Sequence, residues 1–407
     1  MTNPPAPQPP GRFALTGGRL VLPQQIVDGA ALLVEGGAIL GVARPGDLGS
    51  EVAAVDVGGR YVAPGLIDIH IHGALGRTFN EPAAEAFATI TAHAARCGVT
   101  SLLATVATAP VADLVRCLAF GAEWMGARRP GAQVLGVHLE GPYFSAEQRG
   151  AQDPAALRVP DDGSLPLLLA HHRAIAMLSY APELPGALDL TGRLAELGIV
   201  PAAGHSSATD ADVRDAVRRG LRHCIHLWSG QSSTVRRGPW RVPGLLEAAL
   251  AFEGLTGELI ADGKHLPPTL MLLAYRCLGA DRLCLVSDAT SGAGLPEGAR
   301  FRMGQMEYEV HDGVGMLLDR TAFAGSTTML SAMVPIVCRA AAISLPEAVR
   351  MASLTPARVI GAADRKGSLE AGKDADIAIF DDDFTCWRAL IGGRWVEGGS
   401  DALDSTL

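Results

Sequence analysis

The middle of the chain alternates between short aliphatic runs and stretches in which apolar residues recur every three or four positions. Between Gly65 and Asp288 we count eight strand-like runs: "GLIDIHIH", "VTSLLATVAT", "AQVLGVHLEGP", "AIAMLSYAPE", "GIVPAAGHS", "RHCIHLWSG", "TGELIADGKH" and "RLCLVSDAT". Helix-like stretches separate them, and this alternation predicts an α/β fold, a (β/α)8 TIM barrel. A doubly wound open sheet is the alternative. It is disfavoured because "GLIDIHIHGALG" lacks the G-x-G-x-x-G turn that such a sheet needs after its first strand.

Both ends of the chain carry another pattern, in which short β-type runs are separated by glycine-rich turns. "RFALTGGRLVL" and "GAALLVEGGAILGVA" lie near the start, and "GKDADIAIFDDDFTCWRALIGGRWVEGG" lies near the end. We therefore predict a small discontinuous β-sandwich domain made of residues 12–62 and 366–407, with the barrel at 63–365. The proline-rich residues 1–11 are expected to form a disordered leader.

The composition is that of a globular enzyme. Of the 407 residues 48% are hydrophobic and 19% are charged, which is enough for a large core. The net charge of -9 gives no electrostatic footprint for nucleic acid or an anionic membrane, so we expect neither as a partner. The seven cysteines are widely spaced without a CxxC, which favours reduced thiols. No signal peptide and no apolar run of the roughly 18 residues in a membrane span are found. We expect a cytoplasmic protein.

Residues of the types that bind metals stand at the ends of the predicted strands. They are His70, His72, Glu140, His205, His226, Asp262, His265 and Asp288. The carboxyl ends of barrel strands form one face, which carries the active site in barrel enzymes. Taken singly, each residue could be a packed histidine or a turn cap. Together, each would need its own partner in the same small space. Imidazole and carboxylate groups predict a Zn²⁺ site, with Fe²⁺ or Mn²⁺ as alternatives.

The first strand illustrates why these groups need a partner. In "GLIDIHIHG" the side chains alternate, so Asp68, His70 and His72 share one face of the strand. Buried polar side chains cost free energy unless they are paired or bound. We expect the two histidines to reach the metal, with Asp68 as an outer partner. Four histidines in helices or at a strand start are assigned to packing instead: His93, His171, His172 and His223.

An ordered series of motifs resembles one known family. The motifs are "APGLIDIHIHG", "GVHLEGPY", "SYAPE", "AGHSSAT", "IHLWSG", "ADGKH", "VSDA", "FAGST" and "MASLTPARVIGAADRKGSLEAGKDADIAIFD". From about residue 12 to 397 the chain resembles enzymes of the amidohydrolase superfamily, and among them the N-acetylglucosamine-6-phosphate deacetylases. The resemblance implies a metal-dependent hydrolase that converts N-acetylglucosamine 6-phosphate to glucosamine 6-phosphate and acetate. Its partner would be a small amino-sugar phosphate.

The resemblance also implies a role for each residue of the site. Three residues would hold the principal zinc ion: Glu140, His205 and His226. Two would hold a second metal in binuclear members, with the glutamate bridging: His70 and His72. Whether this chain takes one metal or two stays open. Asp288 would accept the proton of the attacking water and pass it to the leaving amine. "IAMLSYAPE" has no lysine, which favours the glutamate-bridged type over hydantoinase-like enzymes with a carboxylated lysine.

The chain departs from the family pattern at two places near the predicted substrate. Gln152 stands where the family usually has a histidine that contacts the acyl carbonyl of the substrate. A glutamine amide can donate a hydrogen bond but carries no charge, so the contact would be weaker. Ser229 and Gly230 replace an Asn-Ala pair that helps to hold the sugar phosphate. The reaction class is therefore better defined than the substrate.

Two retained residues favour a phosphorylated substrate. Arg237 of "STVRRGPWR" aligns with the family's phosphate-binding arginine, which reaches into the neighbouring subunit, and a homodimer is implied on that ground. A solvated surface loop is the alternative interpretation of this basic stretch. His265 matches another phosphate or sugar contact. Two other functions remain open: an amidohydrolase acting on a different N-acyl sugar, N-acyl amino acid or small amide, and a non-catalytic metal-binding relative.

Overall fold

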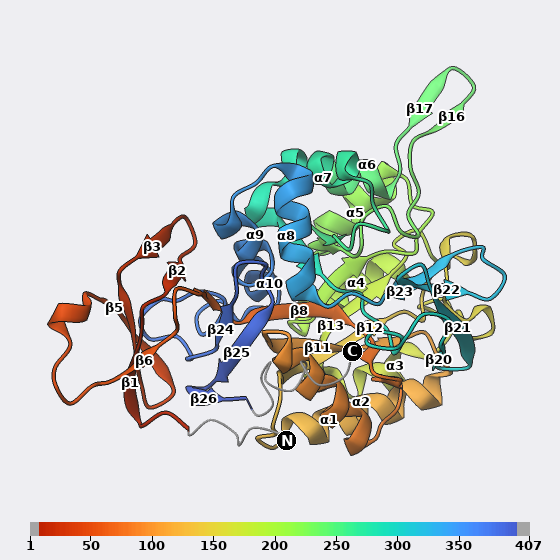
Figure 1. Ribbon diagram of the computed structural model, residues 1–407. Coiled ribbons are helices and arrows are strands. Elements are labelled where there is room, and N and C mark those ends of the chain that lie inside the picture. Colours follow the sequence, from red (N-terminus) through yellow and green to blue (C-terminus); the bar gives the residue numbers. More distant parts are fainter. Residues whose placement is uncertain (1–7, 397–407) are drawn as a thin grey trace.

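The computed structural model describes residues 8–396 and is built around a ring of parallel strands (Figure 1). Eight strands follow one another around the ring in sequence order: β8 (Leu66–Ile71), β11 (Val99–Ala107), β12 (Gln133–Glu140), β13 (Ile175–Tyr180), β14 (Val200–Ala203), β15 (His223–Cys224), β18 (Thr256–Ile260) and β19 (Leu283–Val286). The ring closes beyond β19, where the Asp288 N–H donates to the His70 carbonyl (2.8 Å) and Ala289 forms a parallel bridge with Ile71. The predicted (β/α)8 barrel is confirmed.

Helices cover the outside of the barrel (Figure 1). They are α1 (Ala84–Arg96), α2 (Val111–Met125), α3 (Leu165–Leu169), α4 (Ala187–Glu196), α5 (Asp210–Arg219), α6 (Leu245–Ala251), α7 (Pro268–Arg282), α8 (Leu330–Ala341), α9 (Leu345–Met351) and α10 (Leu354–Val359). The start of α5 is set by a capping box, in which Thr209 and Asp212 satisfy each other's backbone N–H groups. Within residues 8–396, no helix combines the length and the apolar character that crossing a membrane requires.

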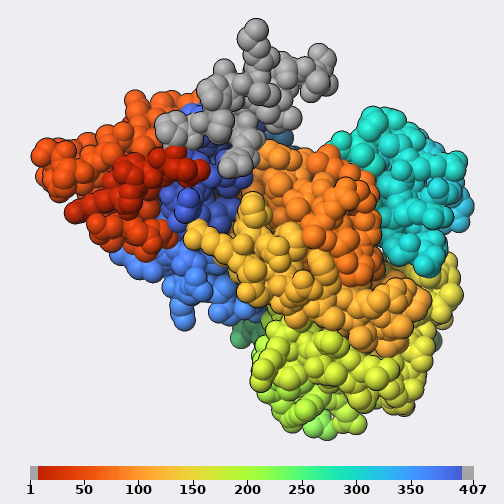
Figure 2. Space-filling view, turned by 90° about the horizontal axis from the view of Figure 1, so that it is seen from below, coloured from red at the N-terminus to blue at the C-terminus, as the bar shows by residue number. Residues whose placement is uncertain are grey.

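The two ends of the chain form one β-sandwich beside the barrel. One sheet has the order β5-β4-β1-β6 and the other β26-β25-β24-β7-β2-β3. The strands are β1 (Arg12–Thr16), β2 (Arg19–Val21), β3 (Ile26–Asp28), β4 (Ala31–Glu35), β5 (Ala38–Ala43), β6 (Ala53–Asp56), β7 (Tyr61–Pro64), β24 (Ile377–Phe380), β25 (Cys386–Ile391) and β26 (Arg394–Trp395). Antiparallel pairing of β24 with β7 joins the two ends, which Figure 2 shows side by side in blue and red. The predicted discontinuous sandwich is confirmed.

The sandwich has its own apolar core, separate from that of the barrel. Phe13, Leu32, Ile377 and Leu390 are among the buried residues of this core, and they come from both ends of the chain. At the margin, the Gln8 side chain exchanges hydrogen bonds with the backbone of Trp395. The exact domain boundaries stay predictions. Residues 1–7 of the predicted leader and the predicted C-terminal stretch 397–407 lie outside the described residues.

Three small β elements are not predicted by the sequence pattern. An antiparallel sheet follows β19 and consists of β20 (Arg300–Met303), β21 (Met306–His311), β22 (Val314–Leu317) and β23 (Phe323–Ser326). A hairpin of β16 (Val235–Arg237) and β17 (Trp240–Val242) projects from the barrel, at the upper right of Figure 1. A short hairpin of β9 (Gly73–Ala74) and β10 (Arg77–Thr78) follows β8. The first of these encloses the cavity at the strand ends, and the second carries Arg237.

Candidate metal centre

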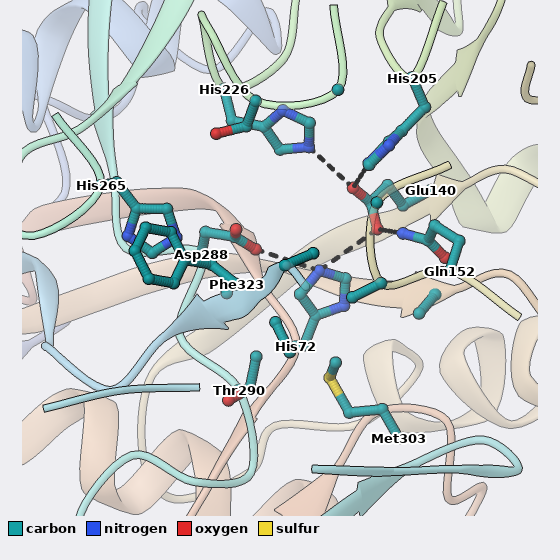
Figure 3. Close-up of a pocket in the computed structure, with 18 of the residues that line it drawn as sticks. His72, Glu140, Gln152, His205, His226, His265, Asp288, Thr290, Met303 and Phe323 are labelled. Atoms are coloured by element: carbon teal, nitrogen blue, oxygen red, sulfur yellow. Dashed lines mark hydrogen bonds and ion pairs between the residues drawn. The ribbon is translucent and has the colours of Figure 1, made fainter. Parts of the chain in front are cut away.

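A cavity of about 390 Å³ opens at the carboxyl ends of the barrel strands. Its polar part contains five of the residues predicted to do chemistry: His72, Glu140, His205, His226 and Asp288. The sheet β20–β23 supplies much of the remaining wall: Met303, Met306, Tyr308, Phe323, Ala324 and Gly325. Figure 3 shows these groups facing one another across the cavity. The predicted residues therefore converge on one site, and a sheet that the sequence pattern does not reveal encloses it.

Glu140, the last residue of β12, lies at the centre of the site. Its Oε1 atom is 3.0 Å from Nε2 of His226 and 3.2 Å from Nε2 of His205. The same oxygen is 3.5 Å from Nε2 of His70, whereas Oε2 is 3.4 Å from Nε2 of His72. All five side chains are buried. A single carboxylate therefore lies within 3.5 Å of a ring nitrogen of each of the four histidines.

The hydrogen bonds behind the histidines test whether these residues fit a cation. Nδ1 of His205 must donate to the Gln148 carbonyl (2.8 Å), because a carbonyl can only accept. In the neutral ring Nε2 then carries a lone pair, and it points at the Glu140 carboxylate. Two acceptors facing each other need a positive ion between them. Ligand atoms of two triads lie within 4.8 Å of one another: His70, His72 and Glu140, and Glu140, His205 and His226. The donor set fits one or two divalent metals.

The electrostatics keep the carboxylates of the site ionised. Burial by itself would raise the pKa of Glu140, but the His205 and His226 rings in contact with the carboxylate hold it well below its usual value. Burial would likewise raise the pKa of Asp288, but the hydrogen bond with His72 and the charge of His70 lower it. Both groups can therefore act as ligand or proton acceptor at neutral pH.

Asp288 lies just beyond β19 and lines the cavity. Its Oδ1 atom is 3.3 Å from Nε2 of His72 and 3.6 Å from Nε2 of His70. Its φ is +45°, and His205 and His226 also have positive φ (+44° and +21°). Side chains other than glycine rarely adopt this backbone conformation, and such residues cluster at functional sites. At the ends of three barrel strands, the residues that carry these side chains therefore have an unfavourable backbone conformation.

Sequence reasoning missed Glu258, a fully buried residue of β18. Its Oε2 accepts hydrogen bonds from Nδ1 of His70 (2.8 Å) and from the N–H of His226 (3.1 Å), and Oε1 lies 3.0 Å from Nε2 of His223. The hydrogen bond between Glu258 and Nδ1 of His70 fixes the His70 ring so that its Nε2 atom is directed at the site. Nε2 of His70 is buried there without a hydrogen-bond partner. The glutamate in the aliphatic run "TGELIADG" was the available signal, equivalent to the histidines of "GLIDIHIHG". His223, assigned to packing, is part of this network.

His138 was also overlooked, although it precedes Glu140 by two residues on the same face of β12. Nε2 lies 2.6 Å from the Ser179 hydroxyl, and Nδ1 lies 3.2 Å from the Ile69 carbonyl. Burial lowers the pKa of His138 to about 3, so the ring is neutral. It packs at 4.7 Å from the His70 ring and supports the first strand. Asp68 behaves as an outer partner, since Oδ1 accepts from the N–H groups of His70 and Ser287.

Four of the residues predicted to bind substrate line the cavity: Gln152, Ser229, Gly230 and His265. Nδ1 of His265 lies 2.7 Å from Oδ2 of Asp262, which fixes that ring in the wall. Gly230 has a φ of +59°, and a Cβ atom there would lie 2.6 Å from Nδ1 of His205 and 2.7 Å from the Gln148 carbonyl. A glycine is therefore needed for the hydrogen bond that orients His205.

Of the five residues predicted to bind substrate, Arg237 is the one that the structure places away from the cavity. It lies on β16 of the projecting hairpin and is exposed. Its neighbour on the paired strand, Trp240, is 75% exposed. Within one chain, Arg237 is not among the residues around the metal ligands. Its predicted contact with a phosphate is therefore not made in the cavity of its own chain as the structure places the hairpin.

The fold and the site are those of a metal-dependent hydrolase. Residues 61–396 match the model described as "Amidohydrolase family", and the chain belongs to this family and, within it, to the N-acetylglucosamine-6-phosphate deacetylases. It is 33% identical to the N-acetylgalactosamine-6-phosphate deacetylase of Escherichia coli O157:H7, over 84% of this chain and 89% of that protein. It is also 33% identical to the N-acetylglucosamine-6-phosphate deacetylase of Vibrio furnissii, over 84% of each.

Solved structures agree with this assignment. The N-acetylglucosamine-6-phosphate deacetylase of Pasteurella multocida is 26% identical, with a TM-score of 0.89 over 95% of this chain and 100% of that one. A mutant of the Mycobacterium smegmatis enzyme, solved in complex with N-acetyl-D-glucosamine-6-phosphate, is 28% identical, with a TM-score of 0.87 over 95% and 99%. The chain is thus an amidohydrolase, and its buried histidine and glutamate groups suit a divalent metal.

Proposed function

We propose that this enzyme removes the acetyl group of N-acetylglucosamine 6-phosphate and releases glucosamine 6-phosphate and acetate. The observation that carries the proposal is the convergence of four histidine nitrogens on the Glu140 carboxylate, with Asp288 beside them. This constellation suits amide hydrolysis, and curated relatives at 33% identity are named for this activity. The proposed roles give the cavity both a ligand set and a proton acceptor, and a purely structural metal site does not need the second.

The metal that we propose is Zn²⁺, with Fe²⁺ or Mn²⁺ as alternatives, because the ligand set mixes imidazole with carboxylate. Glu140, His205 and His226 would hold the principal ion. His70 and His72 would hold a second ion, with Glu140 as the bridge. When bound, the metal supplies a Lewis acid that makes water a better nucleophile and polarises the acyl oxygen.

Asp288 is proposed to move the proton. Its carboxylate accepts the proton of the attacking water and then delivers it to the departing nitrogen, because an amide does not expel an unprotonated amide anion. The lowered pKa of Asp288 keeps this group ready to accept. The hydrogen bond from the Asp288 N–H to the His70 carbonyl holds the backbone of the base against the first strand.

The substrate would lie between the metal ligands and the wall built by β20–β23. We propose that Gln152 meets the acyl end, and that His265, Ser229 and Gly230 meet the sugar phosphate. Arg237 would reach the phosphate from the partner subunit of a homodimer, since the hairpin that carries it projects from its own barrel. Free thiols at all seven cysteines suit the reducing cytoplasm, where we place the enzyme.

A kinetic panel tests the substrate. The metal-loaded enzyme should release acetate from N-acetylglucosamine 6-phosphate with a higher kcat/KM than from unphosphorylated N-acetylglucosamine. N-acetylgalactosamine 6-phosphate belongs in the panel, because a relative of equal identity is named for that epimer. Preference for an unphosphorylated N-acyl sugar or small amide would overturn the phosphate assignment. A metal-loaded protein inactive on every N-acyl compound would favour a non-catalytic relative.

A further inference from the structure

Gln152 has a hydrogen-bonding pattern that fixes which end of its amide faces the metal ligands. Its Oε1 atom accepts from the backbone N–H of Thr108 (3.0 Å), which can only donate. The NH₂ end of the amide must therefore point the other way, and it donates a hydrogen bond to Oε2 of Glu140 (Figure 3). The Gln152 side chain is buried in the wall of the cavity. The amide thus has a single orientation.

We infer that Gln152 is a positioning residue for the Glu140 carboxylate. Rotation of that carboxylate decides which of the four histidines each of its two oxygens faces. Oε2 receives the Gln152 hydrogen bond and lies 3.4 Å from Nε2 of His72, which leaves Oε1 toward His205. An uncharged donor satisfies one lone pair of Oε2 and leaves another for a cation. The inference rests on the ligand set of the proposed function, and it gives Gln152 a task beyond meeting the substrate.

The loop that carries Gln152 also orients a second ligand. Gln148, at the end of a short 3-10 turn (Ala146–Gln148), offers the carbonyl that fixes His205. The loop is held in turn by the Arg149 side chain, which donates to the Gln152 carbonyl (3.3 Å). The Tyr308 hydroxyl, from β21, donates to the Ala151 carbonyl (2.8 Å). Two of the predicted principal ligands are therefore set by one segment, which the sheet β20–β23 holds in place.

Three variants separate the proposed role from a structural one. Gln152→Met keeps the length of the side chain and removes both hydrogen bonds. Gln152→Glu in its ionised form can still accept from the Thr108 N–H but has no proton to donate to Glu140. Gln148→Met is the matched control, because Gln148 acts on His205 through its main-chain carbonyl. Each protein is stripped with a chelator and checked for folding by thermal unfolding. Zn²⁺ affinity is then measured by chelator competition, and ligand geometry by the visible spectrum of the Co²⁺-loaded protein.

We expect Gln152→Met to bind Zn²⁺ about 10- to 100-fold more weakly than the wild type, as for other partners of metal ligands. Its Co²⁺ spectrum should change, and Gln152→Glu should not restore the wild-type spectrum. Gln148→Met should match the wild type in both measurements. The inference is overturned if Gln152→Met keeps the wild-type affinity and spectrum, if Gln152→Glu is indistinguishable from the wild type, or if Gln148→Met loses as much affinity. A wild type that binds no metal would instead refute the ligand set of the proposed function.

Discussion

Replacement of Glu258 by leucine should destabilise the barrel strongly, because this buried carboxylate has three partners. The substitution leaves Nδ1 of His70, Nε2 of His223 and the N–H of His226 without their acceptor. A buried donor that loses its partner costs about 1–3 kcal/mol. Removal of one member of a buried ion pair costs about 3–5 kcal/mol in total. We therefore expect the free energy of unfolding of the metal-free protein to fall by about 3–5 kcal/mol.

Glu258→Gln is the matched control, since the amide can reproduce most of this pattern. Both His70 and His226 donate to one oxygen of Glu258, which the amide oxygen can replace. In the wild type Nε2 of His223 donates to the other oxygen of Glu258, and Nδ1 can accept from the Thr256 hydroxyl (2.6 Å). In the glutamine variant the ring can change tautomer, so that Nδ1 donates to the Thr256 hydroxyl, whose own proton turns to the Arg222 carbonyl. Nε2 of His223 is then free to accept from the amide NH₂. The expected loss is about 0.5–1.5 kcal/mol, the net value of one hydrogen bond.

Urea unfolding of the chelator-treated proteins, followed by circular dichroism, measures both losses. We expect the leucine variant to be less stable than the glutamine variant by roughly 2 kcal/mol or more. If Glu258→Leu unfolds within about 1 kcal/mol of the wild type, a loss no larger than one net hydrogen bond, the buried network does not support the barrel as described. Equal losses in the two variants would show that the shape of the side chain matters and its hydrogen bonds do not.

Three further predictions concern residues around the cavity. Asp288→Asn should lower kcat by about 10²–10⁴-fold with unchanged metal content, and near-normal turnover would refute its role as the base. Gly230→Ala should lower the free energy of unfolding by at least about 1–2 kcal/mol, because the φ of +59° disfavours a side chain and the new Cβ would meet the His205 ring. Thermal unfolding measures this loss, and a variant as stable as the wild type would refute the prediction. Arg237→Ala should raise KM for the phosphorylated sugar by about tenfold or more, the value of one charge-assisted hydrogen bond. The KM for the unphosphorylated sugar should stay unchanged, and equal effects on both substrates would refute a phosphate contact.

The barrel could be predicted because its signal is local and repeated. Each strand is a short aliphatic run, and the carboxyl ends of parallel strands necessarily share one face. The order of the runs is therefore enough to place Glu140, His205 and Asp288 on the same face of the barrel. The discontinuous sandwich could be predicted because both ends of the chain carry the same pattern of short β-type runs separated by glycine-rich turns.

The remaining features depend on contacts that no short pattern encodes. The residues of β20–β23 lie far from the metal ligands in sequence, and only the tertiary fold makes them a wall of the cavity. Glu258 carries a charge inside an aliphatic run, but its partners come from β8 and β15. The family pattern marks Gln152 as unusual, whereas the direction of its amide follows from a hydrogen bond with the Thr108 backbone. The motif around Arg237 predicts a binding residue, and its distance from its own cavity follows from the projecting hairpin.

The most direct test of a metal-dependent deacetylase is acetate release from N-acetylglucosamine 6-phosphate before chelation, after chelation and after Zn²⁺ is restored. The account predicts turnover by the metal-loaded protein, loss of that turnover on chelation, and its return with Zn²⁺. It is contradicted if the metal-loaded protein releases no acetate, or if the stripped protein hydrolyses the substrate at the same rate.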